Sequence, residues 1–234
     1  MGAGVGFREG GRTDGSWGIP RMTDAEIVSL LARQYKGERF DYTEETGGIY
    51  WSLVSGSPDL ILCRGSVNPQ DWMRDFESEL GRALPGWSRL GLLPDGFSRG
   101  LEETLAAFDS RTEHVSRRHL VLAGHSLGAA HAAELAGMFV SSGDLIDRLV
   151  LCGCPRPGTK ALAGLFDPKI IASYRNRSDP VCDVPVAIEP LLPWCPLGSY
   201  LMLDEAPAQD DSWGPLAEHH IELYEAGVAR MTER

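Results

Sequence analysis

The chain has 234 residues, of which 43% are hydrophobic and 24% are charged, and its formal net charge is −11. This length and composition are typical of a single globular domain with a substantial core, and the sequence contains nothing that resembles a linker between two full domains. The negative charge argues against a nucleic-acid partner, whose phosphates require Lys and Arg, and against adhesion to anionic lipid.

The N-terminal segment 1–22 is Gly-rich and polar and lacks the apolar stretch of a signal peptide. We expect a disordered leader there, followed by one domain over 23–234. No apolar run approaches the roughly 20 residues of a membrane-spanning helix. Five cysteines without a visible signal favour reduced thiols and a cytoplasmic location. Cys152 and Cys154 lack the spacing of metal ligands and are expected to be small buried side chains.

A helix and a hairpin are predicted at the start of the domain. Thr23 and Glu26 form a capping-box pattern, which predicts an amphipathic helix reaching about Tyr35. Segments 48–54 and 59–64 are apolar, and the turn sequence Ser-Gly-Ser-Pro separates them. This pattern predicts two strands joined as a β-hairpin.

Helices and strands then alternate along the chain. The predicted elements are helices at 69–80 and 101–114, a strand at 120–123, a helix at 127–139, a strand at 148–152, a helix at 159–165, a strand at 170–175 and a last helix at 216–231. Such alternation predicts an α/β fold with a mainly parallel sheet covered by helices on both faces. The proline-rich segment 180–196 interrupts the pattern, so we expect a long loop without regular structure there.

The most informative segment is Gly-His-Ser-Leu-Gly at 124–128, which follows an apolar strand and precedes a helix of small residues. In such a turn the serine lies on a strained connection, with its hydroxyl exposed and a helix N-terminus behind it. We therefore predict that Ser126 is a nucleophile. The pattern recurs around Ser98, but Pro94 cannot donate to a central strand. Ser98 is expected to precede or open a helix instead.

A serine nucleophile requires a general base, usually a histidine that a carboxylate orients. In α/β-hydrolases these groups follow in the order serine, acid, histidine. Three histidines follow Ser126. His131 lies on the helix that follows Ser126 and is expected to be an ordinary helical histidine that points away from it. The base is therefore His219 or His220.

The acid is expected just beyond the carboxyl end of a strand, at the sheet edge where open α/β sheets place their sites. Asp179 lies four residues after the end of the predicted strand 170–175 and therefore fits this place. Asp183 is the alternative acid. If neither aspartate is catalytic, the segment is expected to be a solvated Asp-Pro turn.

The chain from about Gly48 to Tyr224 resembles the class 3 lipases, also called fungal-type triacylglycerol lipases, of the α/β-hydrolase fold. The motifs that carry the resemblance are Arg64-Gly65-Ser66 with Asp71-Trp72 and Asp75, Asp95-Gly96-Phe97, Gly124-His125-Ser126-Leu127-Gly128, Gly153-Cys154-Pro155-Arg156-Pro157-Gly158, and Asp179-Pro180-Val181 with Pro185. The chain departs from the family at Asp95, where histidine is usual, and at Ala129 and His131, where Gly and an aliphatic residue are frequent. These departures bear on substrate preference.

The resemblance implies that Ser126 is the nucleophile and Asp179 the acid. In the family the histidine precedes a tyrosine by a few positions, and the spacing to Tyr224 selects His219 as the base. His220 stays an alternative.

The resemblance also assigns an oxyanion-hole role to Ser66, and we expect the backbone N–H of Leu127 to be the second donor. This chemistry requires no metal and no organic cofactor. At the position of the family's lid, Trp72 and Phe76 lie on one side of the predicted helix 69–80. That arrangement suits an apolar cover over an acyl pocket, or plain core packing.

Apolar side chains also occur in the proline-rich loop, at Leu191, Leu192 and Trp194, where they contact substrate or cover the sheet edge. The short stretch from Ser66 to Gly96 favours an esterase or lipase acting on short- to medium-chain carboxylic esters or acylglycerols. The alternatives are a hydrolase of amides or thioesters and a non-catalytic binding module. The expected partner is a small-molecule ester or lipid, and the sequence predicts no oligomeric state.

Overall fold

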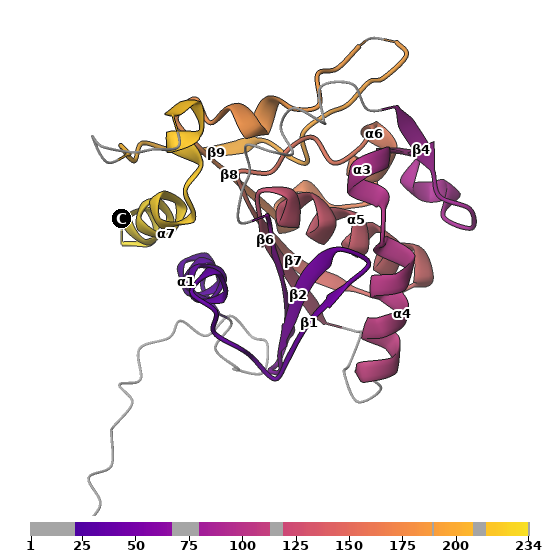
Figure 1. Ribbon diagram of the computed structural model, residues 1–234, viewed down its shortest axis with the longest axis horizontal. Helices are drawn as coiled ribbons and strands as arrows, with labels where there is room; N and C mark the ends of the chain where they lie inside the picture. Colours follow the sequence, from indigo (N-terminus) through magenta and orange to yellow (C-terminus); the bar gives the residue numbers. More distant parts are fainter. Residues whose placement is uncertain (1–21, 67–79, 113–118, 189, 208–213, 234) are drawn as a thin grey trace, which may run out of the picture.

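The computed structural model describes residues 22–66, 80–112, 119–188, 190–207 and 214–233. Within this part of the chain, a sheet of seven strands has the order β1-β2-β3-β6-β7-β8-β9 (Figure 1). Its strands are β1 (Tyr42–Thr46), β2 (Ile49–Val54), β3 (Asp59–Arg64), β6 (Leu120–His125), β7 (Ile146–Cys152), β8 (Ile171–Asn176) and β9 (Tyr200–Leu203). Strands β4 (Gly81–Ala83) and β5 (Leu92–Pro94) pair with each other in a separate small sheet.

Helices connect and cover these strands. The α-helices are α1 (Asp24–Tyr35), α3 (Asp95–Ser98), α4 (Leu101–Arg111), α5 (Leu127–Ser142), α6 (Lys160–Ala163) and α7 (Ile221–Thr232). Short 3-10 helices are η1 (Ser88–Leu90), η2 (Pro168–Ile170), η3 (Pro180–Asp183) and η4 (Gly214–His219). None of the helices in the described ranges is long and apolar enough to cross a membrane.

The sheet is antiparallel at one end and parallel over the rest. Strands β1, β2 and β3 pair antiparallel, whereas every pair from β3 to β9 is parallel. The predicted mainly parallel α/β fold is therefore confirmed. In the parallel part, Cys63 of β3 lies opposite Gly124 of β6. The residues that follow these two strands consequently emerge side by side at the carboxyl edge of the sheet.

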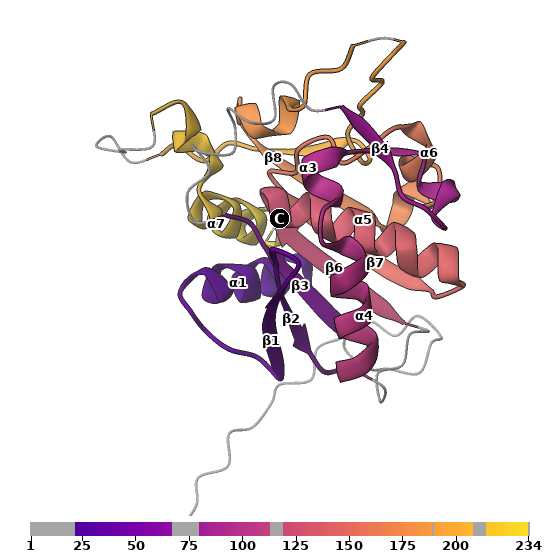
Figure 2. The same cartoon turned by 45° about the vertical axis from the view of Figure 1, so that its right-hand side comes forward.

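The sheet separates two apolar layers. Along β6, Val121 and Ala123 pack on one face against α1 and α7, while Leu120 and Leu122 pack on the other face against α4 and α5. This is the alternation that a strand imposes on its side chains. Figures 1 and 2 show α1 and α7 together on one side of the sheet and α4 and α5 on the opposite side.

Several predicted elements are confirmed. The capping box is present, because Thr23 Oγ1 accepts from the Glu26 N–H and Glu26 Oε2 accepts from the Thr23 N–H. The hairpin corresponds to β2 and β3, and the nucleophile's strand and helix correspond to β6 and α5. Cys152 and Cys154 are buried free thiols, as expected.

Other predictions were wrong in their boundaries. The last helix does not run without interruption over 216–231, because extended backbone at His220 divides it into η4 and α7. Helix α4 ends at Arg111, and α6 spans only Lys160–Ala163, since Gly164 follows it. The segment 180–196 is not free of regular structure, because it begins with η3 and contains isolated bridges.

Strands β1, β4, β5 and β9 were missed. β1 is a polar edge strand, and the other three are only three or four residues long, so periodicity gives a weak signal for them. The predicted helix 69–80 falls outside the described residues, except for Leu80, which has no regular structure.

Candidate active site

Ser126 lies between β6 and α5 in a strained backbone conformation. Its φ of 61° and ψ of −136° fall in a region that residues with a Cβ rarely adopt. The side chain is only 1% exposed, so the prediction of an exposed hydroxyl was wrong. Its Oγ has no hydrogen-bond partner within the described residues. A strained, unpaired serine is typical of a nucleophile on a strand-to-helix turn.

Two glycines permit this turn. A Cβ at Gly124 would lie 2.2 Å from the carbonyl oxygen of Gly128, and a Cβ at Gly128 would lie 2.2 Å from the carbonyl oxygen of Cys63. Any side chain at either position would therefore push α5 away from β3 and β6. The glycines of the Gly-x-Ser-x-Gly pattern are required by this close backbone packing.

Asp179 and His219 form a fully buried pair. His219 Nδ1 lies 2.6 Å from Asp179 Oδ2, and neither side chain is exposed. Asp179 follows β8 at the carboxyl edge of the sheet, and His219 is the last residue of η4. The other imidazole nitrogen, His219 Nε2, is buried and has no partner among the described residues. The geometry is that of a base held in one orientation by an acid.

Two further groups complete the surroundings of the carboxylate. The Tyr224 hydroxyl donates to Asp179 Oδ2, and the Val181 N–H donates to Asp179 Oδ1 at 2.9 Å. Burial by itself raises the pKa of the Asp179 carboxyl, but interaction with His219 and these hydrogen bonds outweigh it, so the pKa of Asp179 is below its ordinary value. The acid is thus held in its charged form.

Asn176 was not predicted to have a role, yet it holds the backbone around the Asp–His pair. Its Nδ2 donates to the carbonyl oxygens of Glu205 and Glu218, each at 3.0 Å, and its backbone N–H donates to the Tyr224 hydroxyl. Glu218 directly precedes His219. The buried amide therefore connects β8 to the turn that carries the histidine.

The predicted oxyanion donors lie beside the nucleophile. A Cβ at Gly65 would come within 2.7 Å of Ser126 Cβ, so the chain entering Ser66 passes directly against the serine. Leu127 is the first residue of α5, where backbone N–H groups lack partners within the helix. The structure thus brings the residue before Ser66 against Ser126, and Leu127 follows Ser126 directly.

The alternative residues lie elsewhere or have other partners. Asp183 forms ion pairs with Arg175 and Arg156. His220 is the N-cap of α7. His131 is buried in α5, and burial lowers its pKa to about 4.

Ser98, the serine of the second Gly-x-Ser-x-Gly pattern, closes α3. Its hydroxyl donates to the carbonyl oxygen of Asp95 at 3.1 Å. Strand β5 precedes α3 but belongs to the small separate sheet, so Ser98 does not follow a strand of the central sheet.

The residues predicted to contact substrate or form a lid differ in exposure, and two of them lie outside the described residues. Trp72 and Phe76 lie outside the described residues. Leu191 is 75% exposed and Leu192 is half-buried, whereas Trp194 is only 3% exposed. The Trp194 ring lies against Gly81 of β4, 3.0 Å from the position of a Cβ there. Trp194 is therefore a packing residue, whereas Leu191 is exposed.

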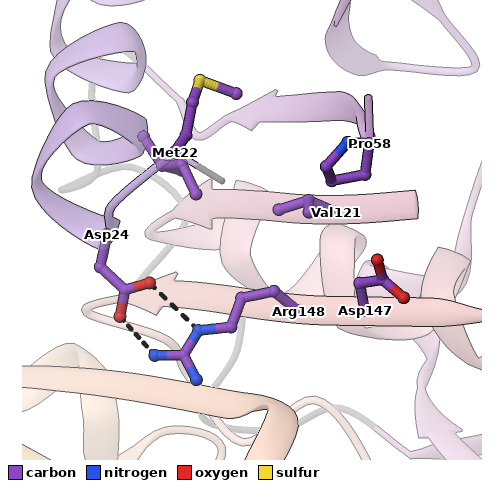
Figure 3. A pocket seen from close by; sticks show the side chains of 7 residues that line it. Met22, Asp24, Pro58, Val121, Asp147 and Arg148 are labelled. Atoms are coloured by element: carbon purple, nitrogen blue, oxygen red, sulfur yellow. Dashed lines mark hydrogen bonds and ion pairs between the residues drawn. The ribbon is translucent and has the colours of Figure 1, made fainter. Parts of the chain in front are cut away.

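A pocket of about 240 Å³ lies at the opposite edge of the sheet (Figure 3). It is lined by Met22, Asp24, Ile27, Pro58, Val121, Asp147 and Arg148. Pro58, Val121 and Arg148 are near the amino ends of β3, β6 and β7, whereas Ser126 lies beyond the carboxyl end of β6. The Arg148 guanidinium is paired with Asp24, as Figure 3 shows. The pocket is thus separate from the Ser126 site.

A parallel sheet, a serine on a strained strand-to-helix turn and a buried Asp–His pair together define the α/β-hydrolase class. The family model described as lipase (class 3) matches residues 60–189, more than half of the chain. The chain belongs to the class 3 lipase family. A sequence comparison with curated proteins gave no significant match.

Solved structures of fungal lipases share the fold. A Rhizomucor miehei lipase propeptide complex superposes with a TM-score of 0.58 at 19% identity, covering 78% of this chain and 65% of that one. The Lip2 lipase of Yarrowia lipolytica gives a TM-score of 0.53 at 19% identity, covering 78% and 68%. A triacylglycerol lipase with a serine protease triad as its catalytic centre gives 0.56 at 20% identity, covering 78% and 77%. The chain thus spans about two thirds of the length of the Rhizomucor lipase.

Proposed function

We propose that the protein is a serine hydrolase that cleaves carboxylic esters, including acylglycerols, through an acyl-enzyme. Ser126, Asp179 and His219 form its catalytic triad. The observation that carries this proposal is that two buried atoms, Ser126 Oγ and His219 Nε2, have no hydrogen-bond partner among the described residues. Leaving both without hydrogen bonds costs stability, and a triad is the function that requires them to be available to each other and to a substrate.

In the first half of the reaction, Ser126 Oγ attacks the ester carbonyl carbon while His219 Nε2 accepts the hydroxyl proton. Asp179 stabilises the resulting imidazolium. When the tetrahedral intermediate collapses, the C–O bond to the alcohol breaks and His219 returns the proton to the departing alkoxide. Water then attacks the acyl-enzyme in the same manner, releasing the carboxylic acid and restoring the Ser126 hydroxyl.

The negative oxygen of the tetrahedral intermediate requires donors. The backbone N–H groups of Leu127 and Ser66, with the Ser66 hydroxyl, are the groups we assign to it. Removing one such donor typically costs about 10²- to 10³-fold in rate. A Ser66→Ala variant tests the hydroxyl separately from the backbone.

One buried apolar cluster supports a substrate with an apolar acyl group. Phe97, Ala130, Val181, Val184 and Leu216 pack together, with Leu127 against them. Three of these follow or precede a triad member closely in sequence: Leu127 is next to Ser126, Val181 is two residues after Asp179, and Leu216 is three before His219. Each triad member thus has a member of this apolar cluster close to it along the chain, and we assign the cluster to the acyl group.

We assign short- to medium-chain esters as the preferred substrates, because the stretch from Ser66 to Gly96 that would cover a long acyl chain is short. The test is hydrolysis of p-nitrophenyl acetate, butyrate and octanoate by the wild type and by Ser126→Ala. Butyrate turnover that disappears in the variant is expected. Folded wild-type protein without turnover would indicate a binding module, and turnover of amide or thioester analogues alone would indicate a different hydrolase.

A further inference from the structure

Three hydrogen bonds connect the oxyanion loop to the base through side chains that the mechanism above does not use. The Gly65 N–H donates to the Tyr35 hydroxyl at 3.0 Å. The Tyr35 hydroxyl lies 2.8 Å from His125 Nδ1. His125 Nε2 lies 2.9 Å from the carbonyl oxygen of His219.

The chemistry of these atoms fixes every proton in the series. A carbonyl oxygen only accepts, so His125 Nε2 carries the proton and donates to His219. In the neutral ring His125 Nδ1 is then an acceptor, and the Tyr35 hydroxyl donates to it while accepting from Gly65. Burial lowers the pKa of His125 well below its ordinary value, which agrees with a neutral ring. Every hydrogen bond in the series therefore has one donor and one acceptor.

Ring packing adds a second connection to the base. The His125 and His219 rings stack with centroids 4.7 Å apart and planes 27° apart. The Tyr35 ring packs edge-on against the His125 ring, with the two centroids 5.4 Å apart. His125 therefore holds His219 both at its backbone and at the face of its imidazole.

We propose that Tyr35 and His125 are positioning residues that fix the catalytic histidine relative to the oxyanion loop. Gly65 directly precedes Ser66, so the series joins the base, which moves the proton, to the loop that carries a donor for the oxyanion. This inference rests on the proposed function, because it assigns His219 as the base and Ser66 as an oxyanion donor.

The first test is Tyr35→Phe, which removes the hydroxyl and keeps the ring. The expected result is a kcat lower by about tenfold, with KM within about twofold, because loss of a single hydrogen bond misaligns the base without altering substrate contacts. The matched control is Tyr174→Phe, which also loses one hydroxyl contact, to Asp24 at 2.7 Å, near the opposite edge of the sheet. It should retain the wild-type kcat.

A spectroscopic measurement separates this inference from the proposed function. In protein labelled with ¹⁵N-histidine, His125 should give the signals of a neutral ring protonated at Nε2. Tyr35→Phe should move its Nδ1 resonance toward that of a free acceptor, and Tyr174→Phe should not. A wild type that hydrolyses no ester would refute the proposed function. An active wild type whose Tyr35→Phe variant keeps both its kcat and its His125 spectrum would overturn the inference.

A conservative replacement of His125 gives an independent check. His125→Gln keeps an N–H able to donate to the His219 carbonyl, whereas His125→Leu keeps only bulk. We expect the Gln variant to exceed the Leu variant about tenfold in kcat. Equal kcat values in two folded variants would contradict a positioning role for this hydrogen bond.

Discussion

Tyr224 donates its hydroxyl hydrogen to the same oxygen of Asp179, Oδ2, that accepts from His219. One carboxylate oxygen therefore holds both the base and the first turn of α7. The tyrosine hydroxyl also accepts from the Asn176 N–H at 3.2 Å, so it is fixed between β8 and the acid. Its position makes the charge of Asp179 depend on a residue that never meets the substrate.

Replacing Tyr224 by Phe should lower both stability and activity. The lost hydrogen bond involves a buried carboxylate, so we expect a decrease of about 1.5–3 kcal/mol in the free energy of unfolding. We expect kcat to fall by about tenfold, since the acid becomes less able to orient His219. Urea unfolding and steady-state kinetics on p-nitrophenyl butyrate check the two effects. Unchanged stability would show that the hydroxyl contributes nothing to holding the acid.

The stability loss in Tyr224→Phe should also depend on pH. The pKa of Asp179 is lowered in the folded protein from an ordinary value of 3.8, so its charged form contributes stability above that value, and the contribution is lost as pH falls through the folded pKa. The difference between wild type and variant should be constant above about pH 5 and shrink below it. A difference that grows on acidification would contradict this assignment.

Gly153 lies against the base and should not tolerate a side chain. Its φ is +55°, and a Cβ would lie 2.7 Å from His219 Cε1 and 3.0 Å from Asp179 Oδ2. Gly153→Ala should therefore cost about 1–3 kcal/mol of stability and at least tenfold in kcat. Gly143→Ala is the control, because Gly143 has a φ of +96° with nothing within 4 Å of its Cβ position. The control should lose stability alone; comparable kcat losses in both variants would mean that crowding of His219 is not the cause.

The two adjacent histidines should differ sharply. His219→Ala should lose several orders of magnitude in kcat, because the proton acceptor is removed. His220→Ala should lose less than about tenfold, since His220 is an N-cap residue of α7. Circular dichroism confirms folding of each variant before the assay. The reverse ranking would assign the base to His220.

Replacing two side chains of the proline-rich loop should distinguish a residue that contacts substrate from one that only packs. Leu191→Ser should lower kcat/KM for octanoate more than for acetate, because each buried methylene contributes up to about 0.8 kcal/mol, and should leave the melting temperature unchanged. Trp194→Ala should instead cost about 3–5 kcal/mol of stability and affect all esters alike. Equal losses on acetate and octanoate in Leu191→Ser would exclude Leu191 from the acyl site.

The strongest predictions from the sequence rest on local patterns with one physical solution. The capping box at Thr23 and Glu26 satisfies the free N–H groups at the start of α1. An apolar strand followed by Gly-x-Ser-x-Gly and small residues requires the close packing seen at Gly124 and Gly128. The acid and base candidates followed from chain order and from the resemblance to the lipase family. These are the parts of the site that sequence reasoning located, and the structure brings Asp179 and His219 into contact.

The remaining features depend on contacts between distant residues. Tyr35 reaches His125 across 90 positions, and no local pattern on α1 distinguishes this tyrosine from one that merely packs. Asparagine is a common turn residue, so the sequence gives no sign of a special role for Asn176. Its role depends on the hydrogen bond from its side chain to the distant Glu218 carbonyl oxygen. The break at His220 was missed because the apolar periodicity continues across it, although η4 and α7 are separate elements.

The central claim is that Ser126 is the nucleophile, and covalent labelling tests it most directly. A fluorophosphonate probe should modify one serine in the wild type, and peptide mass analysis should place the adduct on Ser126. Ser126→Ala should be unlabelled, folded and inactive on p-nitrophenyl butyrate, while Ser98→Ala, which carries the same local motif, should label and turn over normally. An adduct on Ser98, or ester hydrolysis that survives in Ser126→Ala, would contradict the account.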